Sequence, residues 1–199
     1  MLTTTDKLQK RVFDIILSVF GIFMTWWIML LSWIVASLDT KSNGLYIQNR
    51  IGKEGKPFLV FKIKTMKNIK GINTTITKSG DIRITKSGAF FRKTKIDELP
   101  QLFNVLFGSM SFVGPRPDVA GFADKLEGED RIILKLHPGI TGPASLKYKD
   151  EEILLSIQED PEKYNRDVIW PDKVRVNKKY IREWSLKKDI MYIIKTILG

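Results

Sequence analysis

The order of hydrophobic and polar positions separates a long apolar segment from a mixed remainder. Between Ile15 and Leu38 the chain carries no charged residue and is rich in Ile, Leu, Met, Phe and Trp. About 24 residues in a helix extend about 36 Å, which exceeds the about 30 Å of a bilayer's hydrocarbon core. The run is also longer than the about 7–15 apolar residues of a cleaved signal peptide. We therefore predict a membrane helix within residues 1–39, followed by a separate domain at 40–199.

Basic residues flank the apolar segment on both sides. Lys7, Lys10 and Arg11 precede it, and it is followed by Lys41, Arg50, Lys53, Lys56, Lys62 and Lys64. Because positive charge marks the cytoplasmic side of a membrane, this pattern favours a re-entrant helix, which enters, bends and returns, over one that crosses. A bend needs a local cause, and the segment contains no proline. The candidate bend positions are Ser18, Gly21, Thr25 and Ser32.

The remainder of the chain mixes strand-like and helix-like patterns. Two partly alternating stretches, GLYIQNR at 44–50 and PFLVFKIK at 57–64, predict short strands around a turn that contains glycine. Residues 67–88 are loop-like and contain ITKSG twice, at 76–80 and at 84–88. Helical patterns occupy the stretches 98–107, 122–136, 150–166 and 186–198. Together these elements predict a membrane-associated α/β domain, more closely a helix-rich α+β fold.

The last helical stretch, Leu186 to Leu198, is amphipathic and basic. Isoleucines at 190, 193, 194 and 197 oppose lysines at 187, 188 and 195. Such a helix lies on a membrane interface, or it packs its apolar side against an ordinary protein core. The sequence leaves both interpretations open.

Composition restricts the chemistry that is possible. A net charge of +11 calls for anionic partners, either acidic lipid, phosphorylated small molecules or nucleic acid. Nucleic acid is disfavoured because aromatic residues are not interleaved with the basic runs, and anionic membrane lipid already accounts for positive charge. The chain has no cysteine and only one histidine, His137, which excludes thiolate nucleophiles, disulfides and Ser-His triads. Any catalysis must therefore use carboxylates and cations, and the lack of cysteine fits a reducing, cytoplasmic environment.

The segment FFRKTKIDELPQLFNVLFGSMSFVGPRPD at 90–118 carries the strongest candidates. Asp97 and Glu98 follow a run of basic residues that includes Arg92, and they precede a predicted helix that Pro100 helps to start. If Asp97 caps that helix, the free backbone N–H groups favour a bound phosphate, which Arg92 can also reach. An ionised Asp97 can act as a nucleophile without a base, and adjacent carboxylates can hold Mg²⁺. The alternative is that Asp97 is only a helix cap and Glu98 only a surface charge.

Four further residues have both a functional and a structural interpretation. Arg116, held between two prolines, is a phosphate clamp or a structural arginine that pairs with a carboxylate. Lys62 and Lys64 point to one face of a predicted strand, which is a binding site or a solvated surface. His137 precedes Pro138 in a turn-rich segment, where a structural role is favoured on the residues alone.

Five segments, taken together, resemble the bacterial sugar transferase family, the small monotopic phosphoglycosyl transferases. They are KRVFD at 10–14, QNRIG at 48–52, FKIKTM at 61–66, RKTKIDELPQLFNVLFGSMSFVGPRP at 92–117 and PGITG at 138–142. The combination of DELPQLFNVL with MSFVGPRP is highly specific to this family. The resemblance extends over nearly the whole chain.

The resemblance implies a re-entrant membrane helix with the active site on the cytoplasmic face of the bacterial inner membrane. It also implies Mg²⁺-dependent transfer of a sugar-1-phosphate from a UDP-sugar to a polyprenyl phosphate, which initiates glycan assembly. Carried onto this chain, Asp97 is the nucleophile that forms a phosphosugar–aspartyl intermediate, and Glu98 is its partner in catalysis and in metal binding. Arg92, Lys62 and Arg116 belong to the phosphate and nucleotide pocket. Lys64 and His137 complete the candidates for this pocket.

Two departures from the family pattern carry weight. Many relatives break the membrane helix with a Ser-Pro pair, where this chain has Thr25-Trp26-Trp27. An arginine often precedes PGITG, where this chain has His137. These departures support a second hypothesis, in which the protein is a catalytically silent membrane-surface scaffold that retains the fold.

Overall fold

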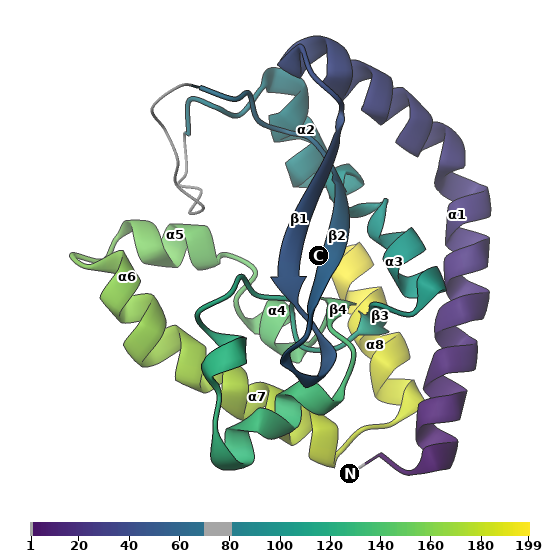
Figure 1. Cartoon of the computed structure of the whole chain (residues 1–199), viewed down its shortest axis with the longest axis vertical. Helices are drawn as coiled ribbons and strands as arrows, with labels where there is room; N and C mark the ends of the chain where they lie inside the picture. Colours follow the sequence, from purple (N-terminus) through teal and green to yellow (C-terminus); the bar gives the residue numbers. More distant parts are fainter. Residues whose placement is uncertain (1, 70–80) are drawn as a thin grey trace.

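A computed structural model describes residues 2–69 and 81–199, and its elements are helices and short strands (Figure 1). The first copy of ITKSG, at 76–80, lies outside the described residues. The strands are β1 (Leu45–Ile51), β2 (Pro57–Ile63), β3 (Ser111–Val113) and β4 (Gly139–Thr141). The helices are α1 (Thr4–Thr40), α2 (Lys86–Thr94), α3 (Gln101–Phe107), α4 (Pro143–Lys147), α5 (Glu151–Ser156), α6 (Pro161–Tyr164), α7 (Trp170–Arg182) and α8 (Leu186–Leu198). The predicted helix-rich α/β architecture is confirmed, whereas its division at residue 40 into two domains stays a prediction.

Helix α1 is one continuous helix that curves along one side of the molecule and over its upper end (Figure 1). Thr3 caps its N-terminus, because the Thr3 hydroxyl accepts from the Asp6 N–H at 3.1 Å while the Thr3 N–H donates to the Asp6 carboxylate at 2.8 Å. Among the described residues, it is the helix whose length and apolar composition suffice to cross a membrane.

Hydroxyl groups along α1 bond back to the helix backbone at three of the four predicted bend positions. The hydroxyls donate from Ser18 to the Ile15 carbonyl, from Thr25 to the Gly21 carbonyl and from Ser32 to the Ile28 carbonyl, at 2.7–2.9 Å. Such side-chain bonds compete with the backbone ladder and bend a helix without breaking it. At the fourth position, Gly21, a β-carbon would lie 3.2 Å from the Leu102 side chain, so the glycine lets α1 approach α3 closely.

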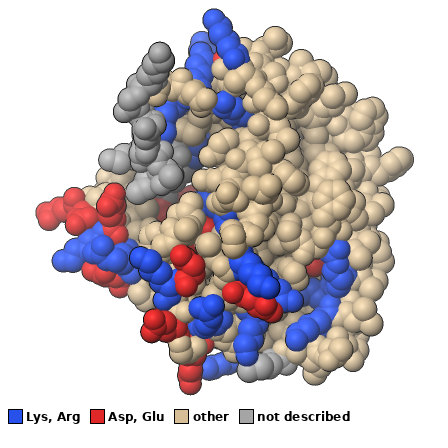
Figure 2. Space-filling view, viewed as in Figure 1, with Lys and Arg blue, Asp and Glu red and all other residues tan. Residues whose placement is uncertain are grey.

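Both ends of α1 are fastened to the rest of the protein. Near its start, the Arg11 guanidinium donates to the Val105 and Leu106 carbonyls at 2.6 and 2.7 Å and so caps the C-terminus of α3. Near its end, the fully buried Ala36 packs against the core residues Ile63 and Phe91. Between these points the outer side of α1 exposes apolar side chains, which form the tan flank of the molecule in Figure 2.

A buried polar cluster joins the start of α1 to α7 and α8. Lys10 Nζ donates to Asp189 Oδ2 at 2.6 Å, and Asp189 is fully buried. The Tyr180 hydroxyl donates to Asp189 Oδ1 at 2.7 Å, and the Trp184 indole N–H donates to Oδ2 at 3.0 Å. The Asp189 carboxylate therefore has charge and hydrogen-bond partners that offset the cost of its burial.

Helix α8 occupies the predicted residues, Leu186–Leu198, and presents two different sides. Tyr192 and Ile193 pack against the main hydrophobic core together with Asp189. The opposite side leaves apolar side chains exposed, among them Ile190, Met191, Ile194, Ile197 and Leu198. The core-facing interpretation is thus confirmed for one side, and the exposed side stays available to an interface.

The strands form two small pairs that frame the candidate site. β1 and β2 are antiparallel, with Tyr46 opposite Lys62, Gln48 opposite Val60 and Arg50 opposite Phe58, which confirms the predicted hairpin. Residues opposite one another share a face, so these six side chains lie on one side of the hairpin. β3 and β4 are parallel, and Ser111 pairs with Gly139. This pairing places the segment that follows Val113 beside the segment that precedes Thr141.

Candidate functional site

The Asp97–Glu98 pair lies in a tight turn between α2 and α3. Helix α2 ends at Thr94, its C-cap residue Lys95 has a left-handed backbone with φ of 59°, and a 3₁₀ turn spans Ile96–Glu98. Helix α3 begins only at Gln101, with Pro100 at its N-cap position and no side-chain cap. The expectation that Asp97 caps a helix starting at Glu98 is therefore wrong. Because a 3₁₀ helix has about three residues per turn, adjacent side chains diverge, and the two carboxylates face different surroundings.

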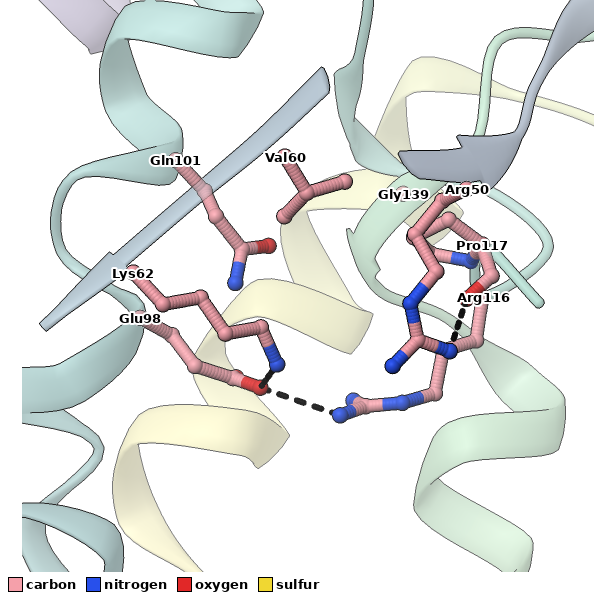
Figure 3. Close-up of a pocket in the computed structure, with 8 residues that line it drawn as sticks. All are labelled: Arg50, Val60, Lys62, Glu98, Gln101, Arg116, Pro117 and Gly139. Carbon is pink, nitrogen blue, oxygen red and sulfur yellow. Dashed lines mark hydrogen bonds and ion pairs between the residues drawn. The ribbon is translucent and has the colours of Figure 1, made fainter. Parts of the chain in front are cut away.

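Glu98 points into a cationic pocket between the hairpin and the segment after β3 (Figure 3). Its Oε1 accepts from Arg116 Nη2 at 3.0 Å and lies 3.4 Å from Lys62 Nζ. Burial disfavours the ionised form of Glu98, but the charges of Arg116, Lys62 and Lys95 outweigh it and lower its pKa to about 2. The ionised form of Glu98 is therefore favoured, and it pairs with Arg116 and Lys62.

Asp97 has the opposite electrostatic character. Its Oδ1 is buried and accepts no hydrogen bond from any residue in the described ranges. Burial raises the pKa of Asp97 to about 6, the negative charge of Glu98 adds to this, and Lys62, Lys95 and Arg92 oppose it. Buried polar atoms almost always have partners, so this unpartnered oxygen makes Asp97 a candidate for binding a ligand or for chemistry.

The pocket brings together residues from five segments of the chain. Its lining consists of Arg50, Val60, Lys62, Glu98, Gln101, Arg116, Pro117 and Gly139 (Figure 3). Burial lowers the pKa of Lys62, the charge of Arg116 lowers it further, and Glu98 opposes both. Three cations facing a single paired carboxylate leave an excess of positive charge, which suits an anion such as a diphosphate.

Arg50 is a pocket residue that the sequence analysis did not single out. Its Nε and Nη2 donate to Gln48 Oε1 at 3.0 and 2.8 Å, and its Nη1 donates to the Pro117 carbonyl at 3.4 Å. Burial and the charge of Arg116 lower the pKa of Arg50. The register of the predicted hairpin would have identified Arg50 as a pocket candidate, because it places Arg50 and Lys62 on the same face.

The remaining predicted residues lie at different distances from this pocket. Arg92 is close enough to Asp97 to influence its pKa, and its Nη1 contacts Met66 Sδ at 4.0 Å. Lys64 lies just beyond β2, and its Nζ donates to the Ser42 hydroxyl at 2.8 Å. His137 does not line the pocket, and the charges that act on it come from Lys53, Arg11 and Lys10. The structure thus joins Lys62, Glu98 and Arg116 directly, with Asp97 and Arg92 beside them.

The donor set fits Mg²⁺ only in combination with a ligand. Within residues 2–69 and 81–199 there is no group of three or more His, Cys, Asp and Glu side chains that could hold a metal. Mg²⁺ usually takes one or two protein carboxylates, and phosphate oxygens and waters complete its shell. The free Oδ1 of Asp97 satisfies the first requirement, and the cationic pocket for a diphosphate supplies the second.

Arg50 should contribute directly to anion binding. We expect Arg50→Ala to weaken the binding of inorganic pyrophosphate about 10- to 100-fold, because hydrogen bonds to charged groups contribute about 1.5–3 kcal/mol. Isothermal titration calorimetry measures this, with Lys56→Ala as the control, since Lys56 is exposed at the hairpin tip. Equal affinities in Arg50→Ala and in the control would show that Arg50 is structural only.

Comparisons with known proteins identify the family of this chain. The family model described as bacterial sugar transferase matches residues 5–199. A Bacillus subtilis protein is 41% identical over 121 residues, 60% of this chain and 68% of that protein, and is named provisionally as an undecaprenyl-phosphate N-acetylgalactosaminyl 1-phosphate transferase.

Two longer relatives match almost the whole chain. A UDP-N-acetylgalactosamine-undecaprenyl-phosphate N-acetylgalactosaminephosphotransferase of Aeromonas hydrophila is 32% identical over 94% of this chain and 42% of its own length. A UDP-glucose:undecaprenyl-phosphate glucose-1-phosphate transferase of Escherichia coli is 33% identical over 98% of this chain and 41% of its own length. This chain therefore spans about two fifths of these two relatives. The family match over nearly every residue establishes that the chain belongs to the bacterial sugar transferase family.

Proposed function

We propose that this protein transfers a sugar-1-phosphate from a UDP-sugar to undecaprenyl phosphate and so initiates the assembly of a bacterial glycan. The names of the relatives support the donor and acceptor classes. The observation that carries the proposal is the unpartnered Asp97 carboxylate beside the Glu98–Arg116–Lys62 cluster. This arrangement offers a nucleophile next to a pocket for a diphosphate.

In the proposed first half-reaction, an oxygen of Asp97 attacks the β-phosphorus of the donor. A bond forms between Asp97 and phosphorus, the bond from that phosphorus to the bridging oxygen breaks, and UMP leaves with the electron pair. In the second half-reaction, a phosphate oxygen of the polyprenyl carrier attacks the same phosphorus, which releases Asp97 and yields the lipid-linked sugar diphosphate. Arg50, Lys62 and Arg116 neutralise the donor phosphates in the pocket.

Glu98 acts in this scheme mainly through the cations that it holds. Its hydrogen bond from Arg116 and its contact with Lys62 keep both groups oriented toward the pocket before the donor arrives. Asp97, with Glu98 beside it, would hold Mg²⁺ together with the donor phosphates. The ion would supply further neutralisation of the diphosphate charge.

We further propose that α1 is re-entrant and that the catalytic part lies on the cytoplasmic face of the inner membrane. Support comes from the fastening of both ends of α1 to the same body, by Arg11 at one end and Ala36 at the other. A helix that crossed the bilayer would place one of these contacts on the wrong side. The exposed apolar side of α8 adds an interfacial surface, and anionic lipid suits the basic flanks.

Cysteine labelling tests the membrane arrangement, because the chain has no native cysteine. We expect single cysteines at Thr4 and Lys41 to react with an impermeant maleimide only from the cytoplasmic side, since both positions lie at the exposed ends of α1. A cysteine at Met24, in the apolar middle of α1, should stay protected from both sides until detergent is added. Labelling of Thr4→Cys from the periplasmic side would contradict the re-entrant arrangement.

The activity itself is tested with purified protein, Mg²⁺, undecaprenyl phosphate and a panel of UDP-sugars. Release of UMP together with a lipid-linked product for at least one donor is the expected result. Exchange of labelled UMP into the donor without acceptor would support the covalent intermediate. Absence of any transfer across a broad panel would remove the proposed function.

A further inference from the structure

The pocket around Glu98 is too small for a complete nucleotide sugar. Its empty space is about 280 Å³ including the open mouth, and pockets for small-molecule ligands enclose about 300–1,000 Å³. The pocket therefore suits the two phosphates, and the sugar and the nucleoside must rest on neighbouring surface. Arg116 and Pro117 form one wall of the pocket, so the residues that follow them along the chain are the first candidates for this surface.

Asp118 directly follows this wall in a segment that is held firmly. Pro115 and Pro117 restrict the backbone on either side of Arg116. The Pro115 carbonyl accepts from the Gly139 N–H at 2.8 Å, and the Asp118 carbonyl accepts from the Ile51 N–H at 2.8 Å. The position of Asp118 relative to Arg116 is thus fixed before any ligand binds.

The Asp118 carboxylate lies among cations whose donors point elsewhere. Lys173, Arg116 and Arg50 all act electrostatically on it. Yet Lys173 donates to both carboxylate oxygens of Glu151 at 2.8 and 2.7 Å, and Arg116 donates to Glu98. No residue in the described part of the chain donates a hydrogen bond to the Asp118 side chain. It therefore keeps its full capacity as an acceptor next to the pocket.

The negative charge of Asp118 determines which part of the donor it can bind. A carboxylate is repelled by phosphate oxygens, so it cannot bind the diphosphate directly. It can accept from neutral hydroxyl groups, and both the transferred sugar and the ribose carry hydroxyls on either side of the diphosphate. Burial raises the pKa of Asp118 to about 6, while Lys173, Arg116 and Arg50 oppose this, and donated hydrogen bonds would stabilise the ionised form further.

We infer that Asp118 accepts a hydrogen bond from a hydroxyl group of the donor beside the diphosphate and so helps to determine donor specificity. The inference rests on the proposed function. It assigns Asp118 a role in substrate recognition that differs from the phosphate binding of Arg50, Lys62 and Arg116. Sites built to hydrogen-bond a hydroxyl discriminate strongly against analogues that lack it.

The test combines Asp118→Asn with donors that lack single hydroxyls. We expect kcat/KM for the preferred UDP-sugar to fall about 10- to 100-fold in the variant. For the one deoxy donor that lacks the partner hydroxyl, wild type and variant should be nearly equal, because the interaction is already absent. Deoxy-sugar donors and a 2′-deoxyuridine or 3′-deoxyuridine donor locate that hydroxyl on the sugar or on the ribose. Either location supports the inference.

Two controls separate this role from others. Asp150→Asn removes the same charge at an exposed position at the start of α5, and its kcat/KM should match wild type for every donor. Inhibition by inorganic pyrophosphate should be unchanged in Asp118→Asn, since pyrophosphate has no hydroxyl-bearing group. The inference is wrong if Asp118→Asn lowers kcat/KM by the same factor for every donor, including all deoxy donors. It is also wrong if the variant weakens inhibition by pyrophosphate by that same factor. In either case Asp118 acts only by positioning the arginines. Inactive wild type would instead remove the proposed function.

Discussion

Asp97→Asn is expected to lower sugar-phosphate transfer by about 10³-fold or more, because an amide replaces the proposed nucleophile. Transfer of labelled sugar phosphate to undecaprenyl phosphate measures the loss. Intact-mass analysis of protein incubated with donor alone should detect a phosphosugar adduct on wild type and none on the variant. Asp150→Asn, which removes an exposed carboxylate, should retain both the activity and the adduct.

The same substitution should leave the fold intact or even stabilise it. Asp97 is a buried carboxylate with an oxygen that no described residue satisfies, which is an unfavourable arrangement for stability alone. A neutral amide of the same size removes that electrostatic cost. Loss of activity with an unchanged or higher melting temperature would therefore place Asp97 in the chemistry. Retention of full activity by Asp97→Asn would refute its role as nucleophile.

Asp189→Ala is expected to lower the free energy of unfolding by about 3–5 kcal/mol, because it removes the ion-pair partner of the buried Lys10 ammonium. The loss also removes the acceptor for Tyr180 and Trp184. Chemical denaturation in detergent, followed by tryptophan fluorescence, measures the change. Lys188→Ala is a matched control from the same helix, since its ion pair with Glu183 is partly exposed and contributes about 1 kcal/mol or less.

A second variant distinguishes a charge effect from a packing effect. Combining Lys10→Met with Asp189→Leu removes both charges and should recover a large part of the lost stability. If Asp189→Ala and Lys188→Ala destabilise equally, the buried cluster does not hold α1 to α8. If the double variant is as unstable as Asp189→Ala, packing rather than charge controls this contact.

Strong local patterns allowed part of the fold to be predicted from the sequence. The alternating stretches became β1 and β2, and the amphipathic stretch became α8 with the same bounds, Leu186–Leu198. The local sequence also singled out the Asp97–Glu98 pair, although the prediction that Asp97 caps a helix was wrong. The left-handed Lys95 backbone ends α2 early and inserts a 3₁₀ turn, and such a conformation has no reliable signature in a non-glycine residue.

Tertiary pairing determined what the sequence could not predict. Arg50 reaches the pocket because the hairpin register sets it beside Lys62, and a one-residue slip would have turned it away. Lys64 and His137 carry suitable chemistry, but Lys64 lies just beyond the end of β2 and His137 does not line the pocket. Asp118 gains its position from a backbone hydrogen bond with Ile51 at the end of strand β1, which spans a long sequence separation.

The two attachment points of α1 also determine how the protein can adapt to a bilayer. A lone membrane helix relieves a mismatch with bilayer thickness by tilting. Here tilting would have to break the Arg11 caps on α3 or the packing of Ala36, so α1 and the catalytic body must move as one rigid unit. In the proposed re-entrant arrangement, the height of Asp97 above the lipid headgroups would therefore be set by the fold. A polyprenyl carrier whose phosphate lies at the same height would then need only lateral diffusion in the membrane to reach Asp97.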